Sequence, residues 1–188
     1  MLRRPRFLWR LMALAFAASA PFALHVDDLF AGQPRLAALT APGEGEPARA
    51  AAISGRAKAI EGDLLEVGGT RVRLFGIDAP EIEQTCRVMI FVWGCGQDAQ
   101  KMLSALIAEH TVRCVEMARD PNGVPAALCE TEAAQLNETM VRIGMALASP
   151  AEPRSFASEE AAAAREGIGV WRSKFDKPWE WRDASAAR

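Results

Sequence analysis

The residues best suited to chemistry lie in one short segment, residues 73–81, which reads RLFGIDAPE. This strand-like stretch ends in two carboxylates and a proline, and Glu61-Gly62-Asp63 lies upstream of it. Carboxylate oxygens bind hard cations such as calcium, and a guanidinium matches the geometry of a phosphate. The segment could therefore serve a metal and a phosphate, although Asp63 alone could be a turn residue and Asp78 alone the end of a strand.

This segment resembles the thermonuclease family, which has the staphylococcal nuclease-like fold. The resemblance continues through residues 136–146, LNETMVRIGMA, to Gly169-Val170-Trp171, so it spans essentially the whole chain after a loose N-terminal region. It implies a calcium-dependent phosphodiesterase lineage, with single-stranded DNA or RNA as the substrate.

The resemblance also implies a role for each residue of the site. Asp63 and Asp78 match the family's metal-binding carboxylates, and Ala79 matches a position that offers calcium only its backbone carbonyl. Glu81 matches the general base that activates a water. Arg73 matches one of two arginines that hold the phosphate.

Four positions depart from the family's pattern. Val124 stands where the second arginine follows the hairpin glycine, Gly123, and Asn122 stands where an aromatic residue precedes it. Leu64 replaces a hydroxyl residue after a metal carboxylate, and Glu61 replaces an aspartate, which is a milder change.

The missing second arginine decides what activity we expect. A single oxyanion donor is worth about a hundred- to a thousandfold in rate, and Val124 cannot supply one. Arg119, just before the turn, is a nearby cation, but reaching the same phosphate would need a different loop path. We therefore expect weak or lost activity in a nuclease-derived domain. The alternatives are an active calcium-dependent endonuclease and a non-catalytic module that binds a protein or an oligonucleotide.

Periodic patterns predict the elements that position these residues. Alternating apolar residues and turn signals predict strands over Gly55–Ile60, Leu64–Val67, Thr70–Ile77, Val112–Met117 and Pro125–Glu130. Helical spacing predicts helices over Gly96–His110, Gln135–Ala148 and Ser155–Glu166, the last starting at a cap and ending at Gly167. This order is typical of an α+β fold, a five-stranded OB-fold β-barrel with three α-helices. The aromatic tail from Val170 to Trp181 is expected to pack back on the domain.

The four cysteines predict two disulfides, because an even count is typical of exported chains. Cys114 and Cys129 are equally far from the centre of the turn over residues 120–123, so they should face each other across two strands. Cys86 and Cys95 then pair by elimination and close the loop after the third strand. Zinc ligation is disfavoured because the sequence contains no CxxC pair.

The N-terminus has the layout of a signal peptide. Four arginines within residues 3–10 precede an apolar run, Leu11–Leu24, which is short for a transmembrane helix. We expect residues 1–25 to be a signal peptide or membrane anchor, 26–52 an Ala/Pro/Gly-rich linker, 53–182 the thermonuclease-like domain and 183–188 a tail. The protein is therefore predicted to be exported, either periplasmic or secreted, or tethered to the inner membrane by the apolar segment.

Charge argues against a general nucleic-acid-binding protein. The chain of 188 residues has a formal net charge of −2, from 22 basic and 24 acidic residues. Removing residues 1–25 takes away four basic and no acidic residues, which leaves 18 against 24 and a net charge of −6. No global basic field is available, so any phosphate binding must be local. Nothing in the sequence indicates an oligomer.

Overall fold

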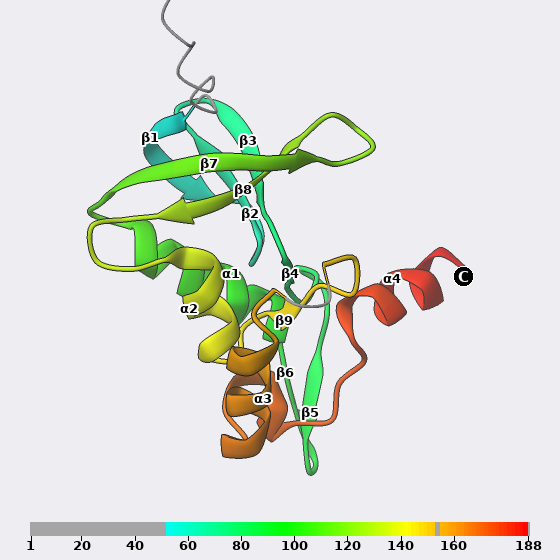
Figure 1. The fold of residues 1–188 in the computed structure, drawn as a ribbon. Coiled ribbons are helices and arrows are strands. Elements are labelled where there is room, and N and C mark those ends of the chain that lie inside the picture. The colour runs from blue at the N-terminus through cyan, green and yellow to red at the C-terminus, as the bar shows by residue number, and fades with distance from the viewer. Residues whose placement is uncertain (1–51, 153–154, 188) are drawn as a thin grey trace, which may run out of the picture. The chain divides into compact units, whose positions relative to one another are not determined.

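A computed structural model describes residues 52–152 and 155–187 of the chain (Figure 1). Five strands form a closed barrel in the order β1-β2-β3-β8-β7, which confirms the predicted OB-type fold. Their bounds are β1 Ala52–Ala59, β2 Leu64–Val67, β3 Thr70–Leu74, β7 Thr111–Arg119 and β8 Pro125–Glu130. The pairings are antiparallel except β3 with β8, which is parallel. The predicted leader, and the predicted linker apart from Ala52, lie outside the described residues.

The barrel closes around aliphatic side chains whose spacing follows the strand and helix periods. Helix α1 (Cys95–Ile107) packs on β1 and buries Ala99, Leu103 and Ile107, which recur every four residues along one face. Helix α2 (Leu136–Arg142) packs on β8. The core contains Leu65, Val67, Val72, Leu74, Leu103, Val112, Leu136, Met140 and Val141.

A buried amide attaches α2 to the barrel. The Asn137 side chain is fully buried, donates to the carbonyls of Phe75 at 2.8 Å and Ala127 at 3.0 Å, and accepts from the Cys129 amide at 3.0 Å. A buried polar group with unmet bonds is costly. Asn137 therefore has a structural role within the segment that carried the family resemblance.

Two predicted elements are shorter than expected because glycines with positive φ interrupt them. Gly76, with φ 78°, divides the predicted strand Thr70–Ile77 into β3 and a short strand β4 (Ile77–Asp78). Gly144, with φ 69°, ends the predicted helix Gln135–Ala148 early, and Leu147–Ala148 instead form β9, which pairs with β4. The strand that carries Asp78 thus leaves the barrel.

The helix count differs from the prediction. Three helices were expected, and the described residues contain four α-helices: α1, α2, α3 (Ala157–Glu166) and α4 (Pro178–Ala186). The prediction that Ser155 starts α3 as its cap is wrong, because Phe156 is the N-cap residue, with φ 57°. Helix α4 was not predicted from the sequence, and it runs four residues past the predicted domain boundary. It starts with a proline at its first position, a common helix start.

The aromatic tail packs back on the domain, as predicted. A 3₁₀ turn (η1, Gly169–Arg172) places Val170 in a second buried cluster with Cys86, Cys95 and Leu147. Trp93, Trp171, Phe175 and Trp179 pack against this cluster. Trp93 comes from a hairpin, β5 (Cys86–Val88) and β6 (Phe91–Trp93), in a region predicted as a loop.

Both predicted disulfides form. Cys114 and Cys129 are directly opposite in the β7–β8 register, and Cys86–Cys95 links the start of β5 to the start of α1. All four cysteines are therefore bridged. A membrane-spanning helix is not found within the part of the chain that the structure describes.

Removing the Cys114–Cys129 bridge should destabilise the barrel. Its sequence separation is 15 residues, and releasing a loop of that size lowers the free energy of unfolding by about 3 kcal/mol in the chain-entropy picture. We expect the Cys114→Ala/Cys129→Ala variant to unfold at lower urea than the parent protein. An unchanged urea midpoint with an unchanged slope would contradict this expectation.

Candidate functional site

Four of the predicted site residues, but not Ala79 or Val124, line one cavity of about 590 Å³. Asp63, Arg73, Asp78 and Glu81 all contribute to its lining. The remaining walls come from the β7–β8 turn, residues 149–152 and α4. Segments that are far apart in the sequence therefore form a single site.

Strand pairing places Arg73 beside Asp63. Arg73 on β3 is opposite Leu64, the residue after Asp63, and its Nη1 lies 3.2 Å from both carboxylate oxygens of Asp63. The chain at Gly62 passes so close to Ala79 that any side chain at Gly62 would collide with it. This close approach brings the neighbouring Asp63 near Ala79. The Ala79 amide points at Asp63 Oδ2 from 3.5 Å, at the limit of a hydrogen bond.

The environment of Asp63 favours an added cation. Its side chain is buried, and this burial is the main reason that its pKa rises to about 7. Arg73 opposes this rise in pKa, whereas the nearby carboxylate of Asp78 adds to it. A buried carboxylate of this kind is stabilised by further positive charge, so this corner of the cavity fits a metal ion chemically.

Arg182 is part of the site and was not singled out from the sequence. From α4, its Nη1 donates to Asp78 Oδ1 at 2.9 Å and to Glu81 Oε1 at 2.6 Å, and its Nη2 donates to Asp78 Oδ2 at 2.7 Å. The bonds to Asp78 are the main reason that the pKa of Arg182 is raised. The proposed metal carboxylate and the proposed base thus share one guanidinium.

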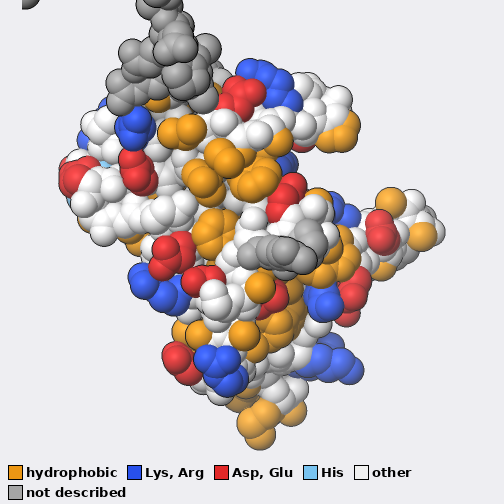
Figure 2. All heavy atoms as spheres, viewed as in Figure 1, with side chains coloured by type: hydrophobic (Ala, Val, Ile, Leu, Met, Phe, Trp, Pro, Cys, Tyr) orange, Lys and Arg blue, Asp and Glu red, His pale blue; other side chains and the backbone are white. Residues whose placement is uncertain are grey.

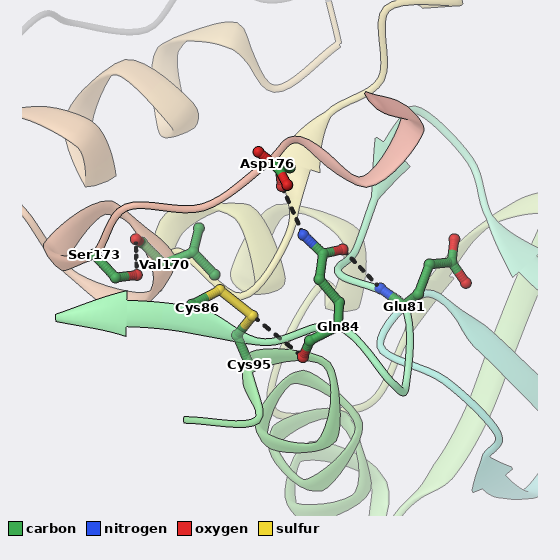
Figure 3. The surroundings of a disulfide bond; sticks show 7 residues. All are labelled: Glu81, Gln84, Cys86, Cys95, Val170, Ser173 and Asp176. Carbon is green, nitrogen blue, oxygen red and sulfur yellow. Dashed lines mark hydrogen bonds between the residues drawn. A yellow bond between two sulfur atoms is a disulfide. The ribbon is translucent and has the colours of Figure 1, made fainter. Parts of the chain in front are cut away.

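A buried glutamine positions both Glu81 and α4 (Figure 3). Gln84 is fully buried; its Oε1 accepts from the Glu81 amide at 3.2 Å, and its Nε2 donates to the Asp176 carbonyl at 2.6 Å. Asp176 lies two residues before α4. The start of α1 also packs on this loop. The contact is so close that a side chain at Gly96 would collide with the Glu81 carbonyl.

The hairpin turn engages the nearby arginine locally. Arg119 lines the cavity, but its Nη1 donates to the Gly123 carbonyl and its Nη2 to Glu116 Oε2, both at 2.8 Å. Asp120 holds the turn by accepting from the Val124 amide at 2.9 Å. In this turn Arg119 therefore bonds to its own hairpin, and replacing the second arginine would require a different path of the loop.

The carboxylates do not form a ready-made metal cage. Among the described residues, no group of three or more His, Cys, Asp and Glu side chains is arranged to hold a metal ion. Asp63 contacts Arg73, and both oxygens of Asp78 contact Arg182. Calcium usually takes six to eight oxygen ligands, so a cation here would need the Asp78 oxygens that Arg182 occupies.

The fold and site together define an OB-barrel domain with an acidic and arginine-lined cavity beside β3 and β4. The family model described as staphylococcal nuclease homologue matches residues 71–173, which is more than half of the chain. The chain therefore belongs to the staphylococcal nuclease homologue family. Domains of this family are generally calcium-dependent.

The chain is also similar to a curated protein. The succinoglycan biosynthesis protein ExoI of Rhizobium meliloti (strain 1021) is 30% identical over 126 residues. The match covers 65% of this chain and 66% of that protein, just under two thirds of its length.

Removing Arg182 should make the carboxylates more available to calcium. Arg182 competes with calcium through two partly exposed ion pairs, each worth up to about 1 kcal/mol. We therefore expect the Arg182→Ala variant to bind Ca²⁺ about tenfold more tightly in isothermal titration calorimetry. The matched control is Arg142→Ala, an exposed arginine on α2 outside the cavity lining. Equal or weaker calcium binding by Arg182→Ala would show that Arg182 does not compete with the ion.

Proposed function

We propose that this chain is an exported, calcium-dependent phosphodiesterase of low turnover that acts on single-stranded DNA or RNA. The observation that carries the proposal is the convergence of Asp63, Arg73, Asp78 and Glu81 on one cavity. This combination of carboxylates and a guanidinium suits hydrolysis of a phosphodiester.

Each residue has a role in the proposed reaction. Asp63, Asp78 and the Ala79 carbonyl would hold calcium, which when bound would neutralise charge on the phosphate. Glu81 would take the proton from the attacking water, since its carboxylate faces the cavity and its loop is held by the packing of α1. Arg73 would bind a phosphate oxygen, because its side chain lines the cavity and is 37% exposed.

Two features support a low turnover. Val124 supplies no charge at the second arginine position, and Arg119 is bound to its own hairpin. Arg182 also donates to Glu81 Oε1, so one oxygen of the proposed base is engaged by a cation. Losing one donor to the transition state accounts for about a hundred- to a thousandfold in rate.

A non-catalytic binding module is the second candidate. Its support is that Arg182 pairs with both Asp78 and Glu81, which neutralises two acids that catalysis would use. The related protein's name refers to succinoglycan biosynthesis, which is compatible with a domain that binds a ligand without cutting nucleic acid.

Two disulfides in the described residues indicate a protein outside the cytoplasm. We place it in the periplasm or the external medium, with residues 1–25 acting either as a cleaved signal or as an inner-membrane tether.

Cleavage should require both calcium and Glu81. We expect purified residues 26–188, which include the whole barrel and both disulfides, to cut single-stranded DNA or RNA slowly with Ca²⁺ and not with chelator. Glu81→Gln should lower the rate at least about a hundredfold, the usual contribution of a general base. Glu83→Gln is the control, because Glu83 is exposed and outside the cavity lining. Absent cleavage by folded, disulfide-bonded protein would favour the binding module.

Restoring the missing cation should raise the rate. The Val124→Arg variant is expected to cleave at least about tenfold faster, since it restores a guanidinium where the family places one. Val124→Met, which adds length without charge, is the matched control and should leave the rate unchanged. If Val124→Arg cleaves no faster than Val124→Met, the absent arginine is not the main defect of the site.

A further inference from the structure

The tip of the β5–β6 hairpin exposes a run of large apolar side chains. Of the six large hydrophobic residues that are exposed in the described part of the chain, four are consecutive here. Their exposed fractions are 85% for Met89, 85% for Ile90, 69% for Phe91 and 59% for Val92. The space-filling view shows an apolar cluster at the lower end of the molecule, where Figure 1 places this tip. Contiguous exposed apolar patches of this kind mark interaction sites.

The turn keeps a bulky residue where a glycine would be less strained. Val88 pairs with Phe91, so Met89 and Ile90 form a two-residue turn, and Met89 has φ 53°. Two-residue hairpin turns favour glycine, asparagine or aspartate at such positions. The fold itself gains no burial from Met89, so its side chain is available for a contact outside the domain.

The hairpin is a fixed arm rather than a loose loop. The Cys86–Cys95 bridge ties its base to α1. Arg87 and Lys174 exchange two backbone hydrogen bonds, at 2.9 and 2.8 Å, which fasten β5 to the segment after η1. A rigid arm presents its tip without an ordering cost on binding.

Three basic residues lie near the base of this arm. Arg87, Arg172 and Lys174 are exposed there, and the Arg172 guanidinium lies 4.7 Å from the centre of the Trp93 ring. Arg87 and Lys174 also line a hollow of about 300 Å³, together with Thr85 and with one acid, Asp176. The chain as a whole carries a net charge of −2, so this positive charge is local.

We propose that the β5–β6 hairpin docks the domain on an anionic lipid bilayer. Met89, Ile90, Phe91 and Val92 enter the boundary between headgroups and acyl chains, and Arg87, Arg172 and Lys174 contact the lipid phosphates. An exposed apolar tip with basic residues near its base matches a bilayer, since lipid chains accommodate a protrusion and anionic headgroups attract nearby cations. This inference is independent of the catalytic proposal.

Vesicle sedimentation tests the proposal, using residues 26–188 so that the N-terminal apolar segment plays no part. We expect this chain to bind vesicles of equal phosphatidylglycerol and phosphatidylcholine, and to bind phosphatidylcholine vesicles much more weakly. Ile90→Ser/Phe91→Ser should lower vesicle binding at least about tenfold, since each methylene buried in the bilayer adds to the free energy of binding. Met117→Ser is the matched control, because Met117 is an exposed apolar residue on β7, outside this hairpin.

The contribution of the basic residues and the insertion of the tip into the bilayer are tested separately. Arg87→Gln/Lys174→Gln should lower binding to anionic vesicles about twenty-fivefold, because each basic residue near the surface is worth about fivefold. Phe91→Trp should show quenching by brominated lipid beyond that of the parent protein. Absent binding to anionic vesicles overturns the proposal, and so does binding that the tip variant retains. Self-association that the tip variant abolishes, without vesicle binding, would instead identify a second copy of the chain as the occupant.

Discussion

The buried amide of Gln84 connects parts of the chain that the candidate site needs at the same place. It holds the loop that carries Glu81 on one side and the segment that leads into α4 on the other. Because Gln84 is fully buried, neither bond can be replaced by bulk water without exposing the loop. Leaving one buried partner unsatisfied costs about 1–3 kcal/mol. Arg182 reaches Asp78 and Glu81 on a helix whose start depends on this link.

The protein's own arginines pair with only part of the negative charge that lines the cavity. Arg73 compensates Asp63, and Arg182 compensates Asp78 and Glu81. The balance is unequal, because Asp63 is buried whereas Arg182 is 45% exposed and its ion pairs are screened by solvent. The site therefore retains a buried carboxylate, Asp63, that a cation would stabilise.

One segment of the chain connects the cavity to the apolar hairpin. Residues 81–96 run from the loop that carries Glu81 through β5 and β6 to the start of α1. The Cys86–Cys95 disulfide links two points of this segment. The second buried cluster is contacted both by the hairpin, through Trp93, and by the start of α4, through Trp179. A change that loosens this disulfide would therefore affect both surfaces.

Short-range patterns in the sequence were sufficient for the barrel, the contiguous RLFGIDAPE segment and the Cys114–Cys129 pairing, because strand period, turn chemistry and register act over a few residues. Only the tertiary structure decided the rest. Arg182 is 104 residues from Asp78 in sequence, and no local signal links them. Helix α4 buries little beyond Pro178, so it lacks an apolar stripe. The β5–β6 turn contains Met89 and Ile90 in place of turn residues, so packing and a disulfide, rather than local preference, determine that hairpin.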